Sequence, residues 1–151
     1  MDLSKVKWVV IVLVVVGGGW LVTEGGMDYV FNAATEELPG NDPEKDVIDE
    51  ASLSKYGGFL LSTFRYTKAK IFYTAAIERY GPEGGNYYWN IYQLARCEEK
   101  MGNYESAVLL LRELHNVDGD AFDERVPGRD TLKLRIMKLV ETHDLSHLAV
   151  P

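Results

Sequence analysis

Apolar residues are distributed unevenly along the chain, and their pattern separates one continuous run from a long periodic region. Residues 6–22 read VKWVVIVLVVVGGGWLV and carry a single charge, Lys7, near their start. From residue 43 onward, apolar residues recur every three or four positions, which is the spacing of one face of an amphipathic α-helix. The pattern predicts an all-α protein: an N-terminal apolar helix, then amphipathic helices over residues 43–143 and no sheet.

The apolar run predicts a membrane anchor over residues 1–23, with residues 6–23 in the bilayer. A bilayer core of about 30 Å takes roughly 20 apolar residues, with a lower limit near 17. Trp8 and Trp20 lie near the two ends of the run, where aromatic rings favour the headgroup region. A buried core helix would need a larger domain around it. A cleaved signal peptide would need a small-residue cleavage site, and Thr-Glu-Gly-Gly-Met follows instead. We therefore expect an uncleaved signal anchor.

The charges beside the run predict its orientation. Lys5 and Lys7 precede it, Glu24 and Asp28 follow it, and the next base is Lys45. Because basic residues stay on the cytoplasmic side, the N-terminus is expected in the cytoplasm and residues 24–151 outside it. A bacterial inner membrane protein facing the periplasm fits this arrangement.

Three adjacent glycines, Gly17, Gly18 and Gly19, interrupt the valines of the run. Small residues let a neighbouring transmembrane helix approach closely, which makes these three candidates for helix packing in the membrane. They cover most of the helix circumference rather than one face. Relaxed selection in a helix that only needs to be apolar is therefore an equal interpretation.

The net charge of the chain comes from one short segment. Sixteen Lys and Arg stand against 23 Asp and Glu, a net charge of −7, and residues 24–50 alone hold nine acids and one base. An acidic chain is a poor candidate for binding DNA or RNA. Composition predicts that residues 24–42 are a solvated acidic connector; a strap along a partner is the alternative. Asp42-Pro43-Glu44 predicts a helix start, with Asp42 as the N-cap.

Two similar segments follow the connector. In residues 88–121 a turn, Gly102-Asn103-Tyr104, is followed by Ala107, and in residues 50–83 Tyr66 is followed three positions later by Ala69. Gly102 suits the left-handed end of a helix and Asn103 the start of the next. Phe64 occupies the place of the turn glycine in the first segment. Apolar residues continue the second segment: Ile91, Leu94, Ala95, Leu111 and Leu114.

This pattern resembles the tetratricopeptide repeat, a helical hairpin with Gly-x-Tyr at its turn and Ala in its second helix. The resemblance implies an array of two hairpins in a domain over residues 43–151, and Gly57 matches the first-helix glycine of the family. Residues 130–143, with Leu132, Ile136, Leu139 and Val140 on one face, predict a helix that caps the array, begun by Asp130. The loop 118–129 could carry contacts or simply be tolerated.

The family binds partner polypeptides in a groove lined by the first helix of each hairpin. Carried onto the second repeat, the groove residues are Trp89, Tyr92, Arg96, Glu99 and Lys100. Tryptophan, tyrosine and arginine are the residues most enriched in binding hot spots. The alternative is that Trp89 and Tyr92 simply pack against the preceding hairpin.

Catalytic and metal-binding patterns are scarce. One cysteine, Cys97, excludes an internal disulfide, and its helix position predicts burial. His143 and His147 lack a third ligand nearby, so no metal and no cofactor are expected. Glu98-Glu99-Lys100 is interpreted as a solvated helix face.

We therefore expect a protein that is not an enzyme. It would be a single-pass membrane protein whose helical repeats bind other subunits of a larger membrane complex. A membrane-tethered chaperone or adaptor that acts transiently is the alternative.

Overall fold

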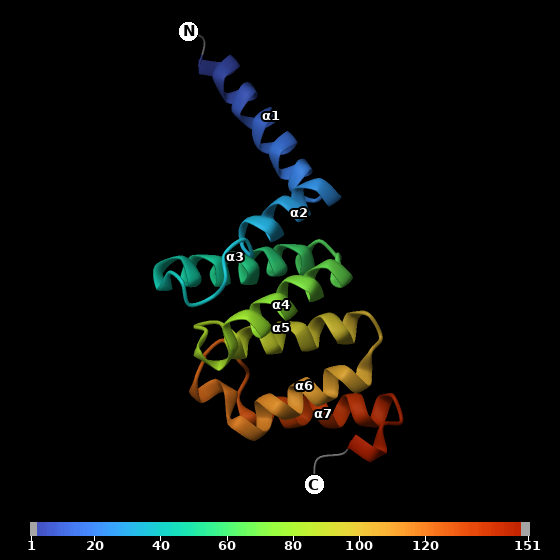
Figure 1. Ribbon diagram of the computed structural model, residues 1–151. Coiled ribbons are helices and arrows are strands. Elements are labelled where there is room, and N and C mark those ends of the chain that lie inside the picture. The colour runs from blue at the N-terminus through green and yellow to red at the C-terminus, as the bar shows by residue number, and fades with distance from the viewer. Residues whose placement is uncertain (1–2, 149–151) are drawn as a thin grey trace. The chain divides into compact units, whose positions relative to one another are not determined.

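The computed structural model describes residues 3–148, with side chains from Val6 onward, and every regular element in that range is helical (Figure 1). The all-α prediction is confirmed there; residues 1–2 and 149–151, at the ends of the predicted anchor and repeat domain, lie outside the described residues. The chain forms two compact units, residues 1–37 and 38–151. The helices are α1 (Leu3–Leu21), α2 (Glu24–Ala33), α3 (Pro43–Ser62), α4 (Tyr66–Tyr80), α5 (Tyr87–Lys100), α6 (Tyr104–Val117) and α7 (Arg129–Thr142), with 3-10 turns η1 (Gly81–Glu83), η2 (Gly119–Ala121) and η3 (Ser146–Leu148).

Helix α1 is an apolar rod with its side chains uncovered. Its large apolar side chains between Val6 and Trp20 are 42–67% exposed. Among the described residues, no single helix meets the length and hydropathy expected of a membrane span, but Val6–Leu21 and α2 meet them together as a pair bent by 79°. The straight anchor predicted over residues 6–23 therefore ends two residues early, at Leu21, and is a candidate only as part of a bent pair.

The bend is made by Thr23. Its hydroxyl donates to the carbonyl oxygen of Trp20 at 2.6 Å and accepts from the amide of Gly26 at 3.3 Å, so it ends one helix and caps the next. A Cβ on Gly26 would collide with the Trp20 carbonyl, so glycine permits the close approach of the two helices. Residues 24–33 of the predicted solvated connector, 24–42, thus form helix α2. The prediction rested on composition and did not consider the Thr23 cap.

The second unit is a linear stack of antiparallel helices. Each of α3 to α7 packs against the next in sequence, and α3 and α7 lie at opposite ends of the stack (Figure 1). Hairpins α3–α4 and α5–α6 occupy the two predicted repeat segments. Asp42 caps α3 as expected, because its carboxylate accepts from the amides of Glu44 and Lys45.

Helix α7 covers the last hairpin, as predicted. Leu132, Ile136, Leu139 and Val140 are buried against the core of α5 and α6, in which Ala107 and Leu111 are fully enclosed. The start of α7 differs from the expectation. Gly128 holds the N-cap position without a side-chain hydrogen bond, and Asp130 lies inside the first turn, where its charge favours the helix dipole.

The turns between paired helices use the left-handed backbone. Gly102 has φ of +81°, as its predicted role requires, and Phe64 at the matching place in the first hairpin has φ of +63°. Asn103 does not cap α6 with its side chain; instead its amide nitrogen donates to Glu98 at 2.7 Å.

Gly57 has a packing role in the first hairpin. A Cβ there would lie 3.0–3.2 Å from ring atoms of Tyr73, a fully buried side chain on α4. The missing side chain therefore lets the tyrosine ring pass directly against the α3 backbone.

Candidate protein-binding surface

The five predicted groove residues lie on α5 and differ in their surroundings. Trp89, Tyr92, Arg96 and Glu99 are half-buried, and Lys100 is exposed. The rings of Trp89 and Tyr92 are neighbours, with centroids 5.7 Å apart. The structure thus brings the two aromatic residues together and leaves part of each accessible.

Arg135 of α7 joins Tyr92 to Glu99. Its guanidinium donates to the Tyr92 hydroxyl at 2.9 Å and forms an ion pair with the Glu99 carboxylate at 2.6 Å. It also lies over the Tyr92 ring, 5.6 Å from the centroid. Burial disfavours the charged form of Arg135, but the hydrogen bond and ion pair with Glu99 outweigh it and raise its pKa. Two of the five predicted residues are therefore already held by a neighbouring helix.

Arg125, from the loop 118–129, lies over Trp89. Its guanidinium carbon is 5.2 Å from the ring centroid, a cation–π arrangement. The same guanidinium donates to the Asn86 side chain at 2.9 Å and pairs with Asp123 at 2.6 Å. The hydrogen bond from Arg125 holds the pKa of Asp123 below its usual range. This loop is thus fastened to the start of α5.

The five groove residues form a stripe along α5, and this stripe divides into two parts at Arg96. Its guanidinium donates to the Gln93 side chain, on the same helix, at 2.8 Å. Lys100 lies at the far end of α5, on the rim of a cleft of about 500 Å³. The cleft lies between the ends of α5 and α7 and the start of α6, and its lining includes Arg135, Lys138, Tyr104, Thr142 and His143.

Sequence reasoning missed both arginines that border the stripe. Glu99 and Arg135 are 36 positions apart, and so are Glu50 and Asn86, whose carboxylate and amide are joined at 2.8 Å between α3 and the start of α5. Residues 36 positions apart in the sequence therefore face each other between α3 and α5 and between α5 and α7. Pairing opposite charges at that offset would have found Arg135; no such regularity points to Arg125.

The prediction of a solvated face at Glu98 was wrong. Glu98 is buried, its carboxylate pairs with Lys70 of α4 at 2.7 Å, and it accepts the amide of Asn103. A buried carboxylate is tolerated because both its oxygens have partners. Glu98 thus joins α4, α5 and the turn before α6, and is a structural residue.

The remaining candidates for chemistry have structural partners. Cys97 is buried as predicted, and burial raises the pKa of its thiol to about 12, which removes the reactive thiolate at neutral pH. His143 stacks on Tyr104, and His147 lies 3.3 Å from Glu105. The described residues contain no group of three side chains arranged to hold a metal ion.

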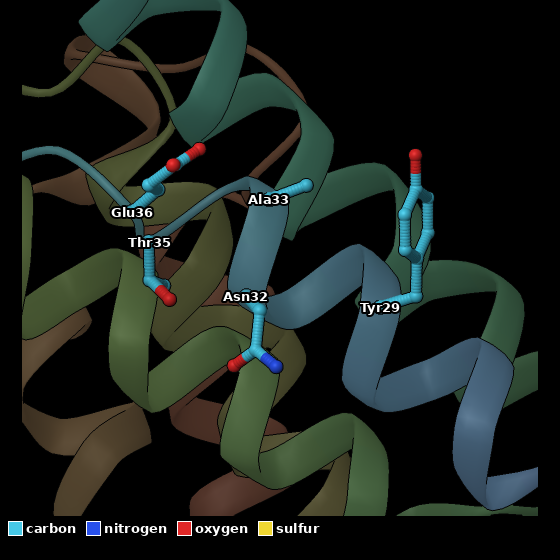
Figure 2. A pocket seen from close by; sticks show the side chains of 5 residues that line it. All are labelled: Tyr29, Asn32, Ala33, Thr35 and Glu36. Atoms are coloured by element: carbon cyan, nitrogen blue, oxygen red, sulfur yellow. The ribbon is translucent and has the colours of Figure 1, made fainter.

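A separate hollow of about 540 Å³ lies at the end of α2 in the first unit, lined by Tyr29, Asn32, Ala33, Thr35 and Glu36. Figure 2 shows that Asn32 and Thr35 point to one side and Glu36 to the other. The polar groups therefore do not converge on a common point, as a catalytic site requires.

No protein-family model, no curated protein and no solved structure matches this chain. The function is therefore argued from the surfaces described above.

Proposed function

We propose that this protein is a non-catalytic, single-pass membrane protein whose tetratricopeptide-like array binds other proteins, as an accessory or assembly subunit of a larger membrane complex. The observation that carries the proposal is the bare apolar surface of α1, attached to a chain in which α5, α6 and α7 bury a shared apolar core. Water disfavours such a rod, and a bilayer accommodates it.

The length of α1 limits how it can be anchored. The sixteen residues from Val6 to Leu21 give about 24 Å at 1.5 Å per residue, less than the roughly 30 Å of a bilayer core. The bent continuation in α2 adds apolar length, and Trp20 and Tyr29, with ring centroids 5.7 Å apart, place two interface-favouring rings beside the bend. We propose that α1 inserts and that the bend lies at the membrane surface.

The array binds its partner through the stripe on α5. Trp89 and Tyr92 supply aromatic area, and Arg125 and Arg135 beside them supply fixed donors for carboxylate or carbonyl groups. Arg96 and Lys100 extend the stripe toward the basic cleft. Preorganised arginines cost little further ordering on binding, which favours recognition at this surface.

Membrane orientation is tested with a reporter fused to the C-terminal residue. The proposal expects activity of a reporter that works only outside the cytoplasm, because Lys5 and Lys7 lie in the first turns of α1, before its uncharged stretch, and acids follow the helix. Activity of a cytoplasm-only reporter would contradict the orientation.

Partner binding is tested with a Trp89→Ala, Arg96→Ala double variant purified from membranes in mild detergent. We expect circular dichroism to stay helical while co-purifying proteins are lost. A matched variant, Leu109→Ala with Lys133→Ala, changes exposed residues on α6 and α7 and should keep them. Unfolding of the Trp89→Ala, Arg96→Ala variant would show that these residues belong to the core. Retention of partners would place the contact elsewhere.

Sizing of the native particle separates the two roles that binding could serve. A stoichiometric large complex supports the subunit role. A monomer or a transient mixture would favour the tethered chaperone.

A further inference from the structure

The first turns of α3 carry an exposed mixed patch. Glu44, Val47 and Ile48 stand at positions i, i+3 and i+4, which places them on one face of the helix. Glu44 is exposed, and Val47 and Ile48 are 66% and 63% exposed. Two uncovered β-branched side chains beside a carboxylate are a costly arrangement for a free surface.

Helix α7 carries the same spacing with the opposite charge. Leu134, Met137 and Lys138 also stand at i, i+3 and i+4, on the side of α7 that faces away from the core. Leu134 is 68% exposed, Met137 is 50% exposed, and Lys138 is exposed. In a helical-repeat array, this outer face of the last helix is where another helix would continue the stack.

The two patches cannot cover each other within one chain. Helices α3 and α7 are the first and last of the stack and lie at its opposite ends (Figure 1). Within the described part of the chain, neither the Glu44 carboxylate nor the Lys138 ammonium has a hydrogen bond or ion pair.

We infer that the α3 patch of one copy docks on the α7 patch of a second copy, head to tail. Val47 and Ile48 would then cover Leu134 and Met137, and Glu44 would face Lys138. The charges of Glu44 and Lys138 favour this pairing, because they attract each other, whereas a contact between two α3 patches brings together carboxylates of like charge. A shared membrane would raise the effective concentration of the copies, so a small contact suffices.

This inference stands apart from the proposed partner groove, because neither patch contains any of the five groove residues on α5. Lys138 alone also lines the cleft beside Lys100. Loss of the groove partners in the Trp89 and Arg96 variant would leave the head-to-tail contact intact. The reverse also holds, so the failure of one proposal is distinguishable from the failure of the other.

Disulfide crosslinking between two tagged full-length copies in membranes tests the contact. One copy carries Ile48→Cys and the other Met137→Cys; the native Cys97 is buried and does not compete. We expect a mixed disulfide at a yield about tenfold above that of Ile48→Cys paired with Leu109→Cys, an exposed position on α6. Adding Glu44→Lys to the first copy should return the yield to the control level, and Lys138→Glu in the second should restore it.

Three results would overturn the inference. One is a mixed yield no higher than the Leu109 control. Another is a yield that Glu44→Lys leaves unchanged. The third is a predominance of disulfides between two Ile48→Cys copies, which would show a symmetric contact. Circular dichroism of each variant in detergent verifies that the helices remain folded.

Discussion

At the scale of the residue, adjacent glycines on α3 have different neighbours. A Cβ on Gly57 would press on three ring atoms of Tyr73 at 3.0–3.2 Å, whereas a Cβ on Gly58 would meet only the Tyr73 hydroxyl, at 3.5 Å. The enclosed ring has little room to move. Overpacking should therefore determine the effect of adding a side chain at Gly57, and helix propensity the effect at Gly58.

We predict that Gly57→Ala lowers the free energy of unfolding by about 1–3 kcal/mol, from the cost of overpacking a core. Gly58→Ala should leave it unchanged or raise it by up to about 1 kcal/mol, from helix propensity. Thermal denaturation of the full chain in detergent, followed by circular dichroism, measures both. Equal changes in the free energy of unfolding of the two variants would mean that the Tyr73 ring moves aside without cost.

The buried thiol of Cys97 predicts a specific loss of stability in alkali. Its pKa is about 12 when folded and near 9 when exposed, so the unfolded chain ionises first as the pH rises. The stability it contributes is complete below pH 9 and is lost between about pH 9 and 12. Cys97→Ala should therefore show a smaller fall in denaturation midpoint than the unaltered chain between pH 8 and 10.5. Parallel curves would contradict the assignment.

Glu98 shows why some residue roles were not predictable. The run Glu98-Glu99-Lys100 reads as surface, yet Glu98 is buried and Glu99 is half-buried. The partner of Glu98, Lys70, is on another helix, and nothing local marks the pair. A charged side chain can be buried when a partner of opposite charge lies beside it. That partner lies far away in the sequence, so the neighbouring residues do not reveal it.

At the scale of the element, helix boundaries were predicted best where a single residue sets the backbone. Asp42 and Gly102 each act within one turn of the helix they border, so the sequence contains the whole signal. Helix α2 was missed because the prediction rested on acidic composition and did not consider Thr23, which caps the helix. A cap acts on the amides next to it, so it marks one helix boundary. Composition is an average over a segment and marks none.

The two hairpin turns give a paired prediction. Gly102 and Phe64 both have positive φ, and a Cβ at Gly102 would meet nothing within 4 Å, so backbone conformation alone decides the effect there. Gly102→Val should destabilise the protein by about 1 kcal/mol or more, because a β-branched residue is strained in the left-handed region.

Phe64→Gly should have the opposite effect and stabilise by about 1 kcal/mol, since it relieves the same strain. Phe64 is 77% exposed, so little packing is lost with its ring. Thermal midpoints of the two variants are compared with that of the parent chain. A fall with Phe64→Gly would show that contacts of the ring outweigh the backbone strain.

At the scale of the whole molecule, the array should fold independently of the apolar helix. Residues 38–151 form one of the two compact units, and consecutive helices α3 to α7 pack throughout it. We predict that a chain of residues 38–151 is helical and unfolds in a single cooperative transition, with coincident curves by circular dichroism and tyrosine fluorescence. Non-coincident or gradual melting would show that the array depends on the preceding segment.

The number and order of the array helices were predictable from sequence, but the composition of the binding surface was not. Apolar periodicity locates each helix, because burial of one face is a property of that helix alone. Trp89 and Tyr92 were placed in the groove by the resemblance to the tetratricopeptide repeat. Arg125 and Arg135 reach the same surface from a loop and from the last helix, and their positions depend on how the hairpins stack.

The contact of Arg125 with the Trp89 ring also gives the protein an intrinsic fluorescence probe. Of the three tryptophans, Trp8 and Trp20 belong to the bare apolar helix, and Trp89 alone belongs to the array. A chain with Trp8→Phe and Trp20→Phe therefore emits from one indole, placed under a guanidinium that only the loop 118–129 can supply. Its fluorescence follows whether that loop is seated, in membranes and in real time, without an added dye.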